Sequence, residues 1–149
     1  MMTLQTIKKS IDIDAPKEKV WAVLIQEPYN LDWYDEFSPG TRAESDWKPD
    51  SKVVFKDTKG NGMVAQIESF IPHSLLSLRY EGGINEGVED YTSEMARDMK
   101  GGHEIYRLSG DNGKTLLSIE SDMMDEYFDM MSQAWDRALE KIKAIAEKI

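Results

Sequence analysis

The side chains best suited to acid-base chemistry are a glutamate and two tyrosines on strand-like segments. Glu104 and Tyr106 lie two residues apart, so the alternation of a β-strand places them on one face. Tyr80 lies in a second alternating segment and can face them. A carboxyl group or tyrosine turned into a pocket, with its pKa shifted by burial, could transfer a proton. The favoured alternative is a carboxylate at a pocket rim beside packed rings, so no catalytic residue is assigned.

Two groups of acidic residues could be read as metal sites. One group precedes the last apolar stretch and comprises Asp122, Asp125, Glu126 and Asp129. A helix start explains it, because N-cap and first-turn carboxylates complement the helix dipole. Its spacing also lacks the glycine-centred loop of a calcium site. The other group, Asp32, Asp35 and Glu36, is interpreted as a solvated loop. We therefore expect no metal.

The remaining reactive residue types give little support for other chemistries. His73 and His103 are the only histidines, and neither lies in a metal or triad motif. No Gly-x-Ser-x-Gly elbow or phosphate-binding glycine loop occurs. The absence of cysteine excludes disulfides and thiolate ligands. Hydrolase and nucleotide chemistries are disfavoured, and no cofactor is predicted.

Charge and length limit the partners. Lys and Arg total 18 against 28 Asp and Glu, which gives a net charge of -10. Such a field repels phosphate backbones and anionic membranes, so nucleic acid is an unfavourable partner. No apolar run is long enough for a signal peptide or a membrane span. We expect one domain over residues 1–149, without membrane insertion and located in the cytoplasm.

The element that organises the chain is its last stretch, from about residue 122 to 149. Apolar residues recur there at steps of three and four, which stacks them on one face of a helix. They are Phe128, Met131, Trp135, Ala138, Ile142, Ile145 and Ile149. This long amphipathic helix needs a large apolar partner, and a curved sheet is the simplest one.

The upstream chain supplies that sheet. Residues 4–13 alternate as a strand, Pro16 opens a short helix, and residues 29–34 form a second helical piece carrying Trp33. Further strands are predicted near residues 41–47, 52–57, 63–70, 75–81, 103–109 and 114–121. Glycine-rich turns at 60–62 and 110–113 favour antiparallel hairpins. The acidic segment 82–102 is a candidate lid with a short helix over 91–99.

Four stretches of the sequence together carry a family resemblance. They are Ile13 to Leu24, Asp46 to Pro49 leading to Val53-Val54-Phe55, Gly62 to Phe70 followed by Pro72 and Leu75-Leu76, and Trp135 to Lys143. In this order and spacing the chain resembles the START-like superfamily, also called SRPBCC or Bet v 1-like. It is most similar to the branch named after the Hsp90 ATPase activator homologue. Asp50-Ser51 departs from the branch, which commonly has a glycine after the proline.

The resemblance implies an α+β helix-grip fold. In this fold, six to seven antiparallel strands wrap around a long C-terminal helix, with two short helices after the first strand. Members of the superfamily bind lipids, hormones or polyketides, and some are cyclases, hydrolases or chaperone regulators. Fold membership alone does not choose among these functions.

We expect a cavity between the helix and the sheet that binds a small hydrophobic or amphipathic molecule. Its predicted wall comprises Trp33, Phe55, Ile67, Leu78, Tyr80, Tyr106, Leu117, Phe128, Met131 and Trp135. The alternative for these residues is a filled core, because apolar stripes usually pack. Two other functions remain open: a cyclase or hydratase using a pocket carboxylate or tyrosine, and a chaperone co-regulator. The protein could be a monomer or a homodimer.

Overall fold

A computed structural model describes residues 4–149, and within them an antiparallel sheet of eight strands packs against helices. The elements in chain order are β1 (Leu4–Ile13), α1 (Lys17–Ile25), α2 (Tyr29–Tyr34), β2 (Arg42–Glu44), β3 (Lys52–Lys56), β4 (Gly62–Ile71), β5 (Leu75–Asn85), β6 (Val88–Asp90), α3 (Glu94–Met99), β7 (His103–Ser109), β8 (Thr115–Met124), a 3₁₀ turn (Asp125–Tyr127) and α4 (Phe128–Lys148).

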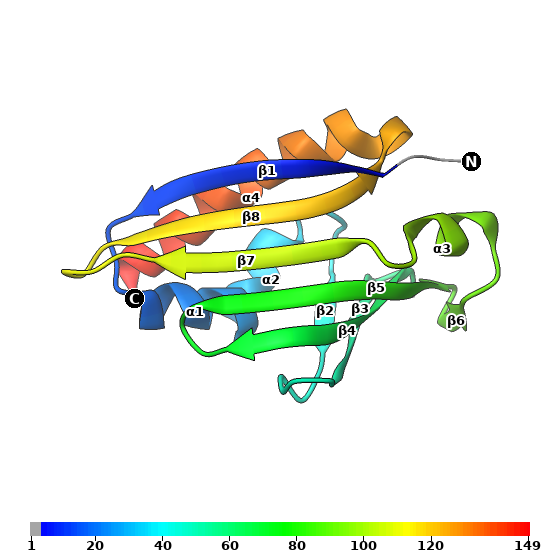
Figure 1. Cartoon of the computed structure of the whole chain (residues 1–149), viewed down its shortest axis with the longest axis horizontal. Coiled ribbons are helices and arrows are strands. Elements are labelled where there is room, and N and C mark those ends of the chain that lie inside the picture. The colour runs from blue at the N-terminus through cyan, green and yellow to red at the C-terminus, as the bar shows by residue number, and fades with distance from the viewer. Residues whose placement is uncertain (1–3) are drawn as a thin grey trace.

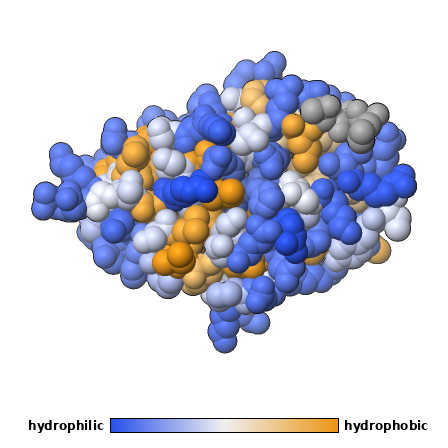
Figure 2. All heavy atoms as spheres, viewed as in Figure 1, coloured by the Kyte–Doolittle hydropathy of each residue, from blue (hydrophilic) through white to orange (hydrophobic). Residues whose placement is uncertain are grey.

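The sheet runs in the order β1-β8-β7-β5-β4-β3-β2, and β6 pairs with β5 outside this path. The long helix α4 lies along one face of the sheet, where it contacts β1, β8, α1 and α2 (Figure 1). This arrangement confirms the predicted helix-grip fold. Hydrophilic residues cover most of the opposite face of the sheet (Figure 2). The space beside α4 is therefore where an apolar site can form.

The short helices α1 and α2 close one end of the grip. Val20, Val23 and Leu24 of α1 are buried in the core. Helix α1 ends at Ile25, before Pro28, since proline cannot continue a helix. The Trp33 indole Nε1 on α2 donates to the Val23 carbonyl at 2.9 Å, which fixes α2 against α1.

The start of the last helix differs from the prediction. Residues 122–124 extend β8, and α4 begins only at Phe128. Asp122 pairs opposite Thr6 and accepts its hydroxyl hydrogen bond at 2.6 Å, and it also accepts from the His103 amide. The helix N-cap, Tyr127, makes no side-chain capping bond. Asp122 therefore holds strands together instead of capping the helix.

The segment 82–102 is more ordered than the sequence indicates. Strand β5 continues to Asn85, and β6 folds back beside it as an eighth strand. The helix predicted over 91–99 is present as α3, but only over Glu94–Met99. Ser93 caps it by accepting from the Ala96 amide at 3.2 Å. The segment thus forms a hairpin and helix that contact β5 and β8.

The turn before β3 explains the departure at Asp50. Asp50 adopts φ of +67°, the left-handed region that favours glycine. The Asp50 amide donates to the Ile67 carbonyl at 2.9 Å, so the turn is tied to β4. The branch's usual glycine suits this conformation, and aspartate is among the few other residues that tolerate it.

Among residues 4–149, no helix combines the length and apolar character that crossing a bilayer requires.

Candidate functional site

A cavity of about 350 Å³ opens between the first half of α4, helix α2 and the inner face of the sheet. Most of its wall is aromatic or thioether, and a few polar residues interrupt it. The lining residues are Trp33, Tyr34, Phe37, Ser38, Thr41, Phe55, Asp57, Asn61, Gly62, Met63, Tyr80, Met95, Met99, Glu104, Tyr106, Met123, Met124, Tyr127, Met130, Met131 and Trp135. The site is therefore an apolar pocket with a small number of fixed polar groups.

Methionines are concentrated at this cavity. The chain has nine, and every one within residues 4–149 lines the wall. They come from β4, α3, β8 and α4, so four elements far apart in sequence deliver them. Two of them, Met95 and Met130, are exposed and mark the mouth. Because methionine is unbranched and polarizable, such a wall can repack around ligands of different shape.

The deep wall is a cluster of aromatic rings. The Trp135 ring lies 4.8 Å from that of Phe37 and 5.9 Å from that of Tyr106, both nearly edge to face. The Trp33 ring lies 6.2 Å from that of Trp135. These separations fall in the favourable range for aromatic pairs. The cluster therefore packs α2 against α4 at the cavity wall.

The polar centre of the cavity is Glu104. Its Oε1 accepts from the Tyr80 hydroxyl at 2.7 Å, and its Oε2 accepts from the Tyr106 hydroxyl at 2.5 Å. Both tyrosines are buried, whereas Glu104 keeps some exposed surface. The three residues proposed from strand alternation thus form one hydrogen-bonded group on the cavity wall.

Burial controls the protonation of this group. It raises the pKa of Glu104, and the hydroxyl hydrogen bonds from Tyr106 and Tyr80 oppose that rise. Burial also raises the pKa values of Tyr80 and Tyr106 well above their ordinary range, and the nearby Glu104 charge adds to this. Both phenols therefore stay protonated and act as donors to the carboxylate.

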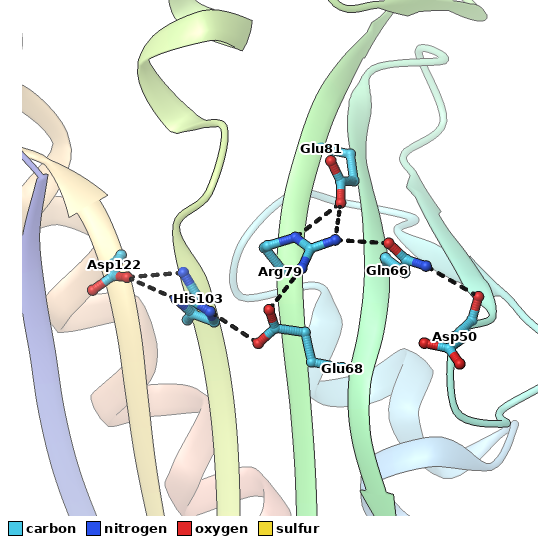
Figure 3. A network of polar contacts seen from close by, with 7 residues as sticks. All are labelled: Asp50, Gln66, Glu68, Arg79, Glu81, His103 and Asp122. Atoms are coloured by element: carbon cyan, nitrogen blue, oxygen red, sulfur yellow. Dashed lines mark hydrogen bonds and ion pairs between the residues drawn. The ribbon is translucent and has the colours of Figure 1, made fainter.

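A polar network on the outer face of the sheet fixes the strands that carry these groups (Figure 3). The Arg79 guanidinium donates to Glu68 at 2.8 Å, and Glu68 in turn lies 2.9 Å from the His103 Nε2 atom. The His103 amide donates to Asp122 at 2.8 Å. This chain of contacts crosses β4, β5, β7 and β8.

The positions of the network residues show which side chains face inward. Successive residues of a strand point to opposite faces, so Arg79 and His103 outside place Tyr80 and Glu104 inside. Leu78 pairs opposite Glu104, and the Tyr80 amide donates to the Gly102 carbonyl at 2.8 Å. A one-residue slip would turn the Glu104 group away from the cavity.

A second polar region lies between the end of α2 and the β3–β4 loop. The Asp57 carboxylate accepts from the Ser38 hydroxyl at 2.7 Å and from the Lys59 and Asn61 amides, each at 2.9 Å. These donors lower the pKa of Asp57. Asp57 is therefore ionised, and its hydrogen-bonding capacity is used to hold the loop.

Sequence comparison assigns the chain to a family. Residues 14–147 match the AHSA1 family, described as Activator of Hsp90 ATPase homolog 1-like protein. The chain belongs to this family. No curated protein sequence matches it significantly. The predicted resemblance to the Hsp90 ATPase activator homologue branch is confirmed.

Solved structures share the fold of this AHSA1-like chain. The Aha1 dimer from Colwellia psychrerythraea is 15% identical, with 97% of each chain covered and a TM-score of 0.73. Protein MLL2253 from Mesorhizobium loti is 13% identical, with 97% of this chain and 98% of that chain covered and a TM-score of 0.74. DynU16, from the dynemicin biosynthetic locus, is 12% identical, with 96% of this chain but 47% of that chain covered and a TM-score of 0.69. At these identities the comparisons show the fold alone.

The structure divides the predicted wall of the AHSA1-like domain into two groups. Trp33, Phe55, Tyr80, Tyr106, Met131 and Trp135 line the cavity. Ile67, Leu78 and Leu117 are instead fully buried in the core, and Phe128 packs against its edge. The three strand residues face inward as alternation indicates, but they pack in the filled core and do not line the cavity.

Other wall residues escaped the sequence analysis. Tyr34 and Phe37 follow the predicted Trp33 closely in sequence. This closeness was the only sign in the sequence that they could also line the cavity. Asp57 was predicted only as the last residue of the strand over 52–57, and the structure places it just after β3, at the cavity wall. Met95 and Met99 lie four residues apart, a spacing that places them on one side of the predicted helix over 91–99, and both line the cavity.

No metal centre is apparent in the part of the chain that the structure describes. Residues 4–149 contain no group of three or more His, Asp or Glu side chains able to hold an ion. The acidic residues near the start of α4 are spread between β8, the 3₁₀ turn and the helix. Glu104 and the two tyrosines that donate to it supply hydrogen-bonding groups at the cavity wall.

Proposed function

We propose that this AHSA1-like protein binds one small hydrophobic or amphipathic molecule in the cavity beside α4. The observation that carries the proposal is the cavity itself, about 350 Å³ walled by aromatic rings and methionines around the Glu104 group. Apolar pockets with a few convergent polar groups are the usual form of small-molecule sites.

The free energy of an empty cavity supports this proposal. At about 24 cal/mol per Å³, a dry and sealed cavity of this volume would cost about 8 kcal/mol. That is comparable to the whole stability of a domain, about 5–15 kcal/mol. Water or ligand must therefore fill the space, and displacing water from an apolar wall favours an apolar ligand.

The segment 82–102 supports the same proposal, because it can act as a lid over the cavity. Its helix α3 contributes Met95 and Met99 to the wall, and Met95 is half-exposed at the mouth. A lid that closes on an apolar ligand excludes water and slows ligand release.

A matched pair of substitutions on α4 tests the proposal. Met131→Trp adds bulk at the cavity wall, whereas Gln133→Trp adds the same side chain at an exposed position of the same helix. The neutral fluorescent probe N-phenyl-1-naphthylamine should bind the wild-type protein at one saturable site. We expect at least tenfold weaker binding to M131W and unchanged binding to Q133W, with circular dichroism confirming that both variants are folded. Equal binding by the two variants, or no saturable binding by the wild type, would reject the proposal.

A reaction in the cavity is the second candidate function. The observation that favours it is a carboxyl group of raised pKa that bridges two buried phenols. The test is to extract any ligand that copurifies and to incubate it with wild-type protein and with Glu104→Gln. Chemical change by the wild type alone would support an enzyme of the cyclase or hydratase kind. Recovery of the unchanged ligand from both would support binding alone.

We propose that the protein is either a monomer or a homodimer. The related Aha1 from Colwellia psychrerythraea was solved as a dimer. Sedimentation of this chain at micromolar concentration would distinguish the two states.

A further inference from the structure

The charges at the cavity wall are all of one sign. The wall carries two carboxylates, Glu104 and Asp57, and no Lys, Arg or His among the described residues. Asp57 already accepts three hydrogen bonds from its own loop and from Ser38. Glu104 takes part in no ion pair within residues 4–149, and its hydrogen-bond donors are neutral phenols. The carboxylate of Glu104 therefore lacks a cation.

We propose that the ligand supplies this cation: it is an amphipathic amine whose protonated nitrogen seats at Glu104 while its apolar body occupies the methionine and aromatic wall. This inference rests on the proposed function, since it names the chemical class of the molecule that fills the same cavity.

The hydrogen-bonding capacity of the Glu104 group matches an ammonium head. A carboxylate offers about four lone-pair sites, and the two tyrosine hydroxyls use one on each oxygen. The remaining sites, together with a free lone pair on each hydroxyl, can accept the N–H donors of a primary amine. A charged donor and a carboxylate form the stronger class of hydrogen bond.

The rings beside Glu104 favour the same head group. Tyr106, which donates to Glu104, has its ring 5.9 Å from Trp135 and 6.3 Å from Trp33. An organic cation held near such faces is attracted by their quadrupoles. An ammonium at Glu104 would also favour the ionised carboxylate and so offset the effect of burial on its pKa.

Charges outside the cavity also favour a positively charged ligand. The net charge of the chain is -10, and acidic side chains of the 3₁₀ turn and of the first turn of α4 lie beside wall residues Tyr127 and Met130. Such a field attracts cations and repels anions. A fatty acid would bring a second carboxylate to Glu104 without any basic side chain to pair with it, so anionic amphiphiles are disfavoured.

Three ligands with one tail test the inference. Octylamine, 1-octanol and octanoate differ in head charge, and each is titrated against protein preloaded with N-phenyl-1-naphthylamine, so that displacement reports on the cavity alone. The wild type should bind octylamine at least tenfold more tightly than 1-octanol, and octanoate most weakly. Glu104→Gln should remove the preference for the amine. Glu126→Gln makes the same change of net charge at an exposed residue near the mouth and should keep it.

The outcomes separate the inference from the proposed function. Wild-type protein that binds 1-octanol as tightly as octylamine would overturn the amine assignment and leave the hydrophobic cavity intact. A preference for octylamine that persists in Glu104→Gln, or disappears in Glu126→Gln, would show that surface charge alone draws the amine. Failure of all three ligands to displace the probe would overturn the amine inference, whereas failure of the probe itself to bind the wild type would overturn the proposed function. If Glu104→Gln does not fold, the wild-type ratio of octylamine to 1-octanol decides the inference.

Discussion

Replacing Tyr106 by phenylalanine isolates the contact between a buried hydroxyl and Glu104. The change removes a donor 2.5 Å from the Oε2 atom and keeps the ring that packs against Trp135. A hydrogen bond to an ionised group contributes about 1.5–3 kcal/mol, and one between neutral groups about 0.5–1.5 kcal/mol. The free energy of unfolding lost in Tyr106→Phe should therefore be larger when Glu104 is ionised.

The sign of the pH dependence follows from the raised pKa of Glu104. The folded protein binds this proton more tightly than the unfolded chain does, so the associated stability is complete below the ordinary glutamate pKa of about 4.3. It is lost as pH rises through the raised folded value. Tyr106→Phe removes a group that lowers this pKa, so it raises the value further and deepens the loss at high pH.

Urea unfolding at pH 4, below the ordinary glutamate pKa, and at pH 8 measures the effect. We expect the penalty of Tyr106→Phe to be about 1 kcal/mol larger at pH 8, or about 2–4 °C in Tm for a chain of this length. Tyr127→Phe is the control, because this cavity tyrosine makes no side-chain hydrogen bond within residues 4–149. In a Glu104→Gln background, the penalty of Tyr106→Phe should be the same at both pH values. An equal penalty at both pH values would refute the reasoning.

Three further substitutions test the packing and the turns. Trp135→Ala should lower the free energy of unfolding by about 3–5 kcal/mol, because Trp135 is 1% exposed within the aromatic cluster. A decrease of less than about 1 kcal/mol, measured by urea unfolding, would contradict this burial. Asp50→Gly should raise the free energy of unfolding by about 0.5–1 kcal/mol, because glycine relieves the positive φ; a lower Tm would contradict this. Arg79→Met should change the free energy of unfolding by less than about 1 kcal/mol, because the Arg79 side chain is 38% exposed; a much larger loss in urea unfolding would show that the outer network is desolvated.

Periodicity in the sequence predicted most strands and helices in their order, and the family resemblance implied the helix-grip fold that they form. The alternation of residues 103–109 gave β7 with its observed bounds, and the apolar stripe from Met131 to Ile142 gave the buried side of α4. Both patterns depend only on backbone geometry, which is why they can be read without a structure.

The boundary between β8 and α4 could not be predicted in the same way. Residues 122–124 continue the strand because they pair with residues 4–6, more than a hundred positions earlier. Asp122 is also an acceptable residue for a helix N-terminus, so its local preference pointed to the wrong element. Long-range pairing decided between the two.

The polar part of the candidate site could be anticipated, whereas the shape of the cavity could not. Glu104 and Tyr106 share a face by the two-residue period, and Tyr80 reaches them across paired strands. Alternation cannot separate an inward residue at the cavity from one in the filled core, so Leu78 was included with Tyr80. Whether an inward-facing residue lines the cavity depends on how closely the helices pack against the sheet at that position. The cytoplasmic location and the ligand remain predictions.

The most direct measurement of the central claim is a titration of protein labelled with [methyl-¹³C]methionine, followed by NMR. All methionines within residues 4–149 line the cavity, and single Met→Leu substitutions assign their signals. Adding the neutral ligand 1-octanol should shift the signals of Met99, Met123 and Met131 along one common saturation curve, and Met131→Trp should abolish the shifts of Met99 and Met123. Wild-type signals that stay unchanged at saturating 1-octanol would contradict a ligand-binding cavity.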